Sequence, residues 1–119
     1  MNNTLLNELQ KRGCAIAEML DQTYMGNEAF YVKMLKKMTA NSSMVKLQEA
    51  IQTADVNALF SASHDLKGVY GTLGLTPLYE KCCEIVEIAR RGSQEGLAEK
   101  IAVLAQLHED FMKLISENG

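Results

Sequence analysis

Apolar side chains recur every three or four positions along almost the whole chain, and polar residues fill the positions between them. This spacing is typical of helices that bury one face, and no stretch shows the strict alternation that predicts a strand. A weaker pattern over residues 39–43 predicts a kink or break within the second helix. The pattern predicts five helices, over residues 4–20, 27–52, 56–73, 76–91 and 93–117.

Short segments with clear start and stop signals join the predicted helices. Asn27 and Asp55 have side chains suited to cap a helix N-terminus, and Gly74 suits a left-handed C-terminal cap. Thr76 followed by Pro77 predicts a helix start, with the threonine hydroxyl as cap and proline at the first helical position. Short connections favour antiparallel neighbours. We therefore predict an all-α fold, an antiparallel up-down four-helix bundle with an additional N-terminal helix.

The length and composition agree with this fold. The 119 residues predict a single domain over residues 1–119, with the core bundle at about 27–117. Hydrophobic residues make up 47% of the chain and charged residues 23%, as in ordinary globular proteins. The net charge of −3 and the absence of one basic block give no footprint for nucleic acid or an anionic membrane. No apolar run could span a bilayer and no signal peptide is visible, so we expect a cytoplasmic protein.

The three cysteines predict neither a disulfide framework nor a metal site. Cys14 stands alone, and Cys82 and Cys83 are adjacent, which is not a zinc-binding spacing. We interpret them as free thiols in a reducing compartment. We expect no metal and no cofactor.

The most informative stretch covers residues 63–74 in the third predicted helix. His64 is followed within seven residues by Lys67, Gly68 and Gly71. Glycine inside a helix costs about 1 kcal/mol relative to alanine, so two glycines here need a reason. On a helical wheel His64 lies more than a quarter-turn from the apolar face, and both glycines share its stripe. We interpret this stripe as a surface that another protein must reach.

An exposed imidazole beside a lysine allows a narrow range of chemistry. Neutral imidazole is a nucleophile, and accepting and passing on a phosphoryl group depends mainly on positioning and charge stabilisation. Lys67, one turn from His64, can stabilise the phosphoryl oxygens as a point cation. Gly68 and Gly71 let a partner's active-site loops come close.

The third helix carries a short motif, His64-x-Leu66-Lys67-Gly68 followed by Leu73-Gly74. This motif resembles the signature of histidine-containing phosphotransfer (HPt) domains of multistep two-component phosphorelays. The order and lengths of the helices agree with that family from about residue 24 to the C-terminus. The resemblance implies that His64 is phosphorylated through Nε2, receiving the group from a receiver-domain aspartate and donating it to another receiver.

The resemblance also implies partners and further roles. The partners are receiver domains of a hybrid sensor kinase or a response regulator, and magnesium belongs to the receiver. Lys67 stabilises the phosphate, and Gly68 and Gly71 clear the docking surface. We expect a phosphotransfer protein and not an enzyme, because 119 residues leave no room for an ATP-binding kinase domain. We expect a monomer that binds neither nucleic acid nor membrane.

Apolar side chains of the second helix are further candidates implied by the resemblance. Tyr31, Met34 and Leu35 are the candidates for the receiver-binding patch, together with Phe30. One position departs from the family pattern. Members often carry a polar side chain on the fourth helix that reaches the histidine, near the position of Val86, which is apolar. The sequence leaves open whether a hydrogen bond supports the imidazole.

Three alternatives compete with phosphotransfer. The first is an HPt-like protein-interaction module that keeps the fold without transfer activity. The second is a metal- or haem-binding bundle, which the sequence disfavours because neither histidine has a glutamate three residues before it; we place His108 on the polar face of the last helix. The third is an oligomerising coiled coil, which the breaks at Gly26, at residues 74–77 and at Gly92 disfavour.

Overall fold

The computed structural model describes residues 3–118, and every regular element in that range is helical. The predicted all-α fold is therefore confirmed. None of these helices is both long and apolar enough to cross a membrane. The elements are α1 (Thr4–Lys11), α2 (Ile16–Gln22), α3 (Glu28–Lys37), the 3-10 turn η1 (Met38–Ala40), α4 (Ser43–Thr53), α5 (Val56–Thr72), α6 (Thr76–Arg90) and α7 (Leu97–Glu117).

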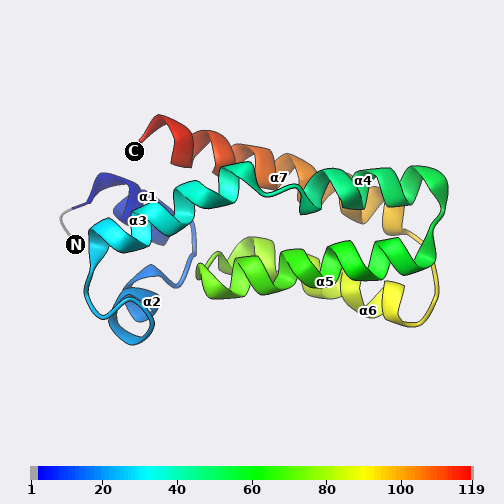
Figure 1. The fold of residues 1–119 in the computed structure, drawn as a ribbon, viewed down its shortest axis with the longest axis horizontal. Helices are drawn as coiled ribbons and strands as arrows, with labels where there is room; N and C mark the ends of the chain where they lie inside the picture. The colour runs from blue at the N-terminus through cyan, green and yellow to red at the C-terminus, as the bar shows by residue number, and fades with distance from the viewer. Residues whose placement is uncertain (1–2, 119) are drawn as a thin grey trace.

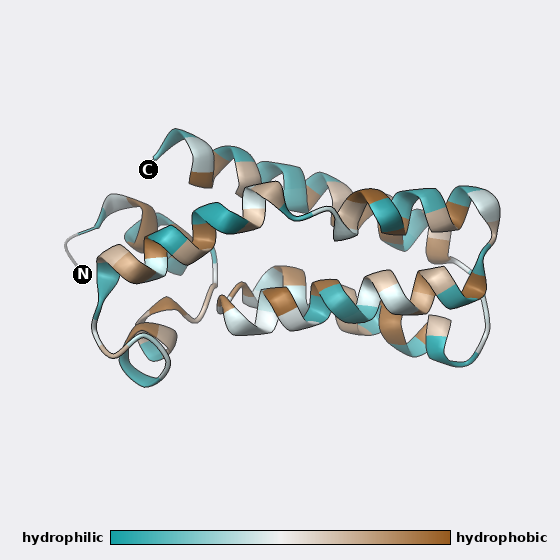
Figure 2. Ribbon diagram, in the orientation of Figure 1, coloured by the Kyte–Doolittle hydropathy of each residue, from teal (hydrophilic) through white to brown (hydrophobic). Residues whose placement is uncertain are grey.

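The bundle has four sides, with α3, η1 and α4 following one another along one of them (Figure 1). Helix α4 packs on α5, α5 on α6, α6 on α7, and α7 returns to α4. The molecule is elongated, with extents of 44 × 26 × 20 Å. Each helix has a hydrophobic and a hydrophilic side (Figure 2), so the apolar sides meet in one core along the bundle. The core includes fully buried Leu47, Leu66, Ile85 and Leu104, one from each side.

The prediction of one continuous helix over residues 4–20 is wrong. The structure divides residues 4–20 into α1 and α2, which pack on each other at one end of the bundle (Figure 1). The break lies at Gly13, whose φ of 95° is in the left-handed region that a continuing helix does not adopt. The additional N-terminal segment is therefore a pair of short helices.

The predicted break in the second helix is confirmed. Helix α3 tightens into η1, and α4 starts a new helix after Asn41 and Ser42. The Asn41 side chain accepts a hydrogen bond from the backbone N–H of Ser43 at 2.8 Å, which satisfies one of the free donors at the start of α4.

The predicted cap of one helix and the predicted start of another differ from the structure. Helix α6 begins at Thr76, whose hydroxyl donates weakly to the carbonyl of Gly74 (3.4 Å) and does not cap the helix. Helix α7 begins at Leu97 and not at residue 93, because Gly96 adopts a left-handed φ of 72° that the helix cannot include. Ser93 instead closes a turn by accepting the N–H of Glu95 at 3.1 Å.

The N-terminal segment holds the end of α5. The hydroxyls of Tyr24 and Tyr31 donate to the carbonyls of Thr72 (3.0 Å) and Leu73 (2.6 Å). The Ala15 N–H donates to the next carbonyl, that of Gly74, at 2.9 Å. The two tyrosine rings stack with centroids 4.3 Å apart. The carbonyls at the end of a helix lack partners within it, and here three in a row receive donors from a distant part of the chain.

Candidate functional site

Helix α5 is fixed at both ends and presents one face to solvent. At its start the Asp55 side chain accepts the N–H of Ala58 at 3.0 Å, as predicted for an N-cap. Its buried face includes Ser63, whose hydroxyl donates to the carbonyl of Leu59 at 2.7 Å and so leaves no unpaired polar atom in the core. His64, the next residue, is exposed, as the helical wheel predicts.

The Phe60 ring lies next to the imidazole and also contacts a guanidinium group. The Phe60 ring, one turn before His64, has its centroid 5.7 Å from the imidazole centroid, at an interplanar angle of 38°. The guanidinium of Arg90 on α6 lies 5.8 Å from the centroid of the same phenyl ring, and it also pairs with Glu87 at 3.2 Å. Neither residue was predicted from the sequence to be part of the site. The spacing of four residues could have placed Phe60 beside His64, but only the packing of α5 on α6 brings Arg90 to the Phe60 ring.

Lys67 lies on the α6 side of the histidine. Its ammonium nitrogen is 6.0 Å from the centroid of the Tyr79 ring, within the range of a cation–π contact. The side chain is half-buried. A cation–π contact uses none of the three N–H donors of the lysine, so they remain available to an anion.

The two glycines of α5 have different surroundings. A methyl group added at Gly68 would meet no atom within 4 Å, so this position opens directly to solvent. A methyl group at Gly71 would lie 3.3 Å from Cε2 of Tyr79. Gly71 therefore allows close packing of α5 against Tyr79, which differs from the sequence interpretation that both glycines clear an approach. Only Gly68 has open space above it.

A groove of about 460 Å³ runs beside His64 between α5 and the α3–η1 wall. Its α5 side includes His64 and Gly68, and its other side includes Met34 and Met38. Further lining residues are Lys37, Asn41, Asp65, Val69, Thr72 and Leu73. The groove is mostly apolar and has the nucleophilic side chain at its edge, which is the arrangement expected of a surface that docks a partner and presents a reactive group to it.

The candidates from the second predicted helix do not all reach this surface. Tyr31 and Leu35 are fully buried and cannot contact a partner, so their assignment to a receiver-binding patch is corrected. The candidates lie on different sides of α3. Tyr31 and Leu35 face the core, whereas Met34 lines the groove. Phe30, four residues before Met34 on the same stripe, is 47% exposed.

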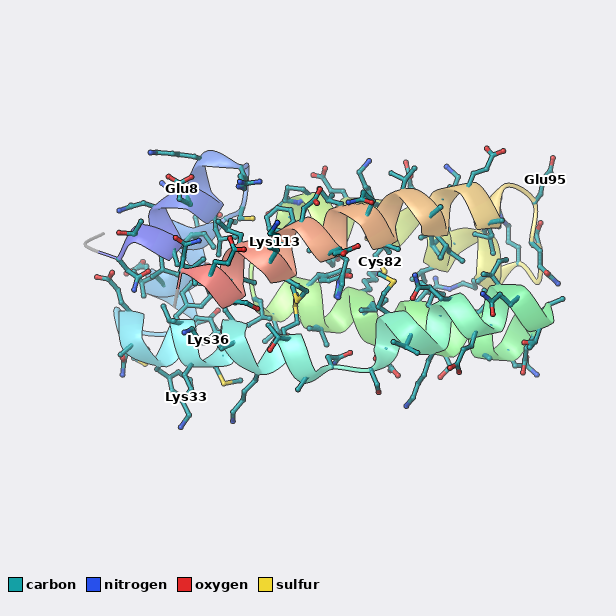
Figure 3. The ribbon with its side chains drawn as sticks, turned by 90° about the horizontal axis from the view of Figure 1, so that it is seen from above. Glu8, Lys33, Lys36, Cys82, Glu95 and Lys113 are labelled. Carbon is teal, nitrogen blue, oxygen red and sulfur yellow. The ribbon has the colours of Figure 1, made fainter. Side chains whose placement is uncertain are left out.

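The core beneath His64 is apolar. Val86 is fully buried and supplies no hydrogen bond. Within residues 3–118 the His64 imidazole has its aromatic neighbour but no hydrogen-bond partner. Cys82 lies inside the bundle (Figure 3), and its thiol donates to the carbonyl of Ser63 at 3.2 Å. Burial raises the pKa of this thiol to about 12, so it stays protonated and serves the packing of α6 on α5.

His108 differs from its predicted place on the polar face of the last helix. It is half-buried, and its Nδ1 lies 2.7 Å from the hydroxyl of fully buried Tyr70. Burial lowers the pKa of His108 from the usual 6.5. The hydroxyl and the imidazole therefore partner each other, with the hydroxyl donating in the tautomer that leaves Nδ1 unprotonated. In the described part of the chain, no three His, Cys, Asp or Glu side chains come together in a group that could hold a metal ion.

The fold and the site together define a class, a helical bundle that presents an exposed histidine beside an apolar groove. The chain belongs to the Hpt domain family, whose model matches residues 37–113, which is more than half of its length. Members of this family are phosphotransfer carriers of phosphorelays and interact with receiver domains; they are not kinases. Comparison with curated proteins and with solved structures gave no match.

Proposed function

We propose that this protein accepts a phosphoryl group on His64 from a receiver-domain aspartate and passes it to another receiver. The observation that carries the proposal is the position of the imidazole, exposed at the edge of an apolar groove and one turn from the open surface at Gly68. Family membership supports the reaction class. The proposal treats residues 1–119 as one phosphotransfer domain.

The transfer needs only groups that the two proteins supply. Nε2 of the neutral His64 imidazole attacks the phosphorus of the aspartyl phosphate while the bond from phosphorus to the aspartate oxygen breaks. The aspartate leaves as a carboxylate, and the phosphorylated ring keeps the proton on its other nitrogen. Lys67 then moves from the Tyr79 ring to the phosphoryl oxygens, where a cation stabilises the charge. The reverse sequence delivers the group to a second receiver.

The docking surface in this proposal is smaller than the sequence suggested. It comprises Met34 and Phe30 from α3 and Gly68 from α5. Gly71 acts through its contact with Tyr79, which places the ring that holds Lys67. The receiver brings its own magnesium ion, and this chain supplies the nucleophile and the cation.

The test is incubation with purified receiver domains that have been phosphorylated with acetyl phosphate. We expect the protein to acquire an acid-labile, alkali-stable phosphoryl group, and His64→Gln to abolish it while circular dichroism stays unchanged. His108→Gln is the matched control, since it removes the other histidine and should leave labelling intact. Labelling that persists in folded His64→Gln would overturn the assignment.

A binding module without transfer activity is the second candidate function. The apolar side chains beneath the imidazole favour it. Val86 offers no hydrogen bond that would orient His64 for attack. The two functions differ in one measurement. A module of this kind would bind receivers in a pull-down or by calorimetry yet show no phosphohistidine under the conditions above.

A further inference from the structure

The end of α3 carries a basic edge, defined here as Lys33 and Lys37. Both side chains are exposed and lie four residues apart, so they project from the same side of the helix. Figure 3 shows Lys33 pointing away from the bundle. Lys36 is half-buried. The one carboxylate of α3, Glu28, is already engaged by the backbone N–H of Asn3 at 3.1 Å.

The basic edge continues the groove beside His64. Lys37 lines that groove, and both lysines line a second shallow hollow along α3. The apolar stripe of exposed Phe30 and half-buried Met34 runs next to them on the same helix. A partner that inserts apolar side chains into the groove therefore brings its neighbouring side chains against two ammonium groups.

The charges of the basic edge are not neutralised within the protein. Neither lysine forms an ion pair with any residue of the described range 3–118, whereas Lys11, Arg90 and Lys100 each do. Asp65 lines the α5 side of the groove but is not within ion-pair distance of Lys37. A favourable interaction with the helix dipole accounts for a lysine in the last turn, but Lys33 lies a turn earlier.

We propose that the basic edge selects receiver domains that carry carboxylates beside the apolar surface entering the groove. This inference rests on the proposed function and adds the charge of its partner. Two unpaired cations on a protein with a net charge of −3 create a local field opposite to that of the whole molecule. Such a field speeds the encounter with an acidic patch and slows the encounter with a basic one, and salt screens it.

A panel of purified receiver domains is first phosphorylated with acetyl phosphate. The experiment then uses the receiver that transfers its phosphoryl group to the wild-type protein fastest. We expect Lys33→Glu/Lys37→Glu to lower kcat/KM for phosphoryl transfer by at least about tenfold at low ionic strength, with the difference shrinking at high salt. Lys81→Glu/Lys113→Glu is the control. It makes the same change in net charge with exposed lysines of α6 and α7, which do not line the groove, and should change kcat/KM little.

A carboxylate near the end of α3 also opposes the helix dipole, so a second variant is needed. Lys33→Gln/Lys37→Gln removes both charges without that effect, and it should produce an intermediate, salt-dependent loss. Equal rates for wild type and both variants at low salt would refute the proposed role of the basic edge in selecting receivers. The proposed phosphotransfer function would be unaffected. If no receiver labels the wild-type protein, the proposed function itself fails and this inference fails with it.

Discussion

Replacing the two glycines of α5 one at a time separates their roles. Alanine is favoured over glycine by about 1 kcal/mol inside a helix. At Gly68 the new methyl group meets nothing within 4 Å, so the gain should appear almost in full. We expect Gly68→Ala to raise the free energy of unfolding by about 0.5–1 kcal/mol.

At Gly71 the same change meets an obstacle. The methyl group would lie 3.3 Å from Cε2 and 3.5 Å from Cδ2 of Tyr79, so the ring must shift. Gly71 is also next to Thr72, the last residue of the helix, where the gain in propensity is smaller. We expect no stabilisation from Gly71→Ala and a loss of up to about 1 kcal/mol if the ring cannot move.

Urea unfolding followed by circular dichroism measures both effects. A destabilised Gly68→Ala would refute the open space above that residue, and equal stabilisation by both variants would refute the contact of Gly71 with Tyr79. The functional arm uses Gly68→Gln, which keeps a good helix former but fills the surface. It should be at least as stable as wild type and yet transfer phosphoryl groups at least about tenfold more slowly, equivalent to about 1.4 kcal/mol. If Gly68→Gln lost both helical stability and phosphoryl transfer, the slower transfer would not show that Gly68 keeps the surface accessible to a partner.

Three further predictions follow from single contacts. Tyr31→Phe removes a buried 2.6 Å hydrogen bond to the Leu73 carbonyl and should lower the free energy of unfolding by about 1–3 kcal/mol in urea, more than Tyr24→Phe, whose bond is longer and less buried. Lys67→Ala should slow phosphoryl transfer or shorten the life of the phosphorylated protein without preventing receiver binding, and unchanged kinetics would refute its role. Burial lowers the pKa of His108, so the unfolded chain takes up its proton more readily; stability should fall as the pH drops from about 6.5 through the lower folded pKa. His108→Gln should remove that part of the pH dependence, and an unchanged pH profile would contradict it.

The face that α5 shows to solvent could be predicted from sequence because a helix repeats its geometry locally. The exposure of His64 follows from the angle between it and the apolar stripe that includes Leu66 and Tyr70, whatever the stripe packs against. The start of the same helix was also predictable, because Asp55 caps within its own segment.

The features that could not be predicted depend on which helix packs on which. Gly68 and Gly71 share a stripe, and only the position of Tyr79 on α6 makes one open and the other tightly packed. The α3 candidates show the same limit, since Leu35 and Met34 are adjacent and both apolar, yet the first is in the core and the second lines the groove. Apolar character alone does not distinguish the two faces of a helix that has a core on one side and a groove beside it.

The contacts that hold the end of α5 in place come from outside the residues that match the family model. That match begins at residue 37, but Tyr24, Tyr31 and Ala15 provide the donors for three consecutive carbonyls at the end of α5. A segment starting at residue 37 would leave these carbonyls to water and would uncover the apolar side chains around Leu73. Those carbonyls belong to the turn that fixes α5 against α6, and α5 in turn places His64 and one wall of the groove. The segment before residue 37 therefore supports the site in two ways, because it supplies the donors that hold the end of α5 and its Met34 lines the groove.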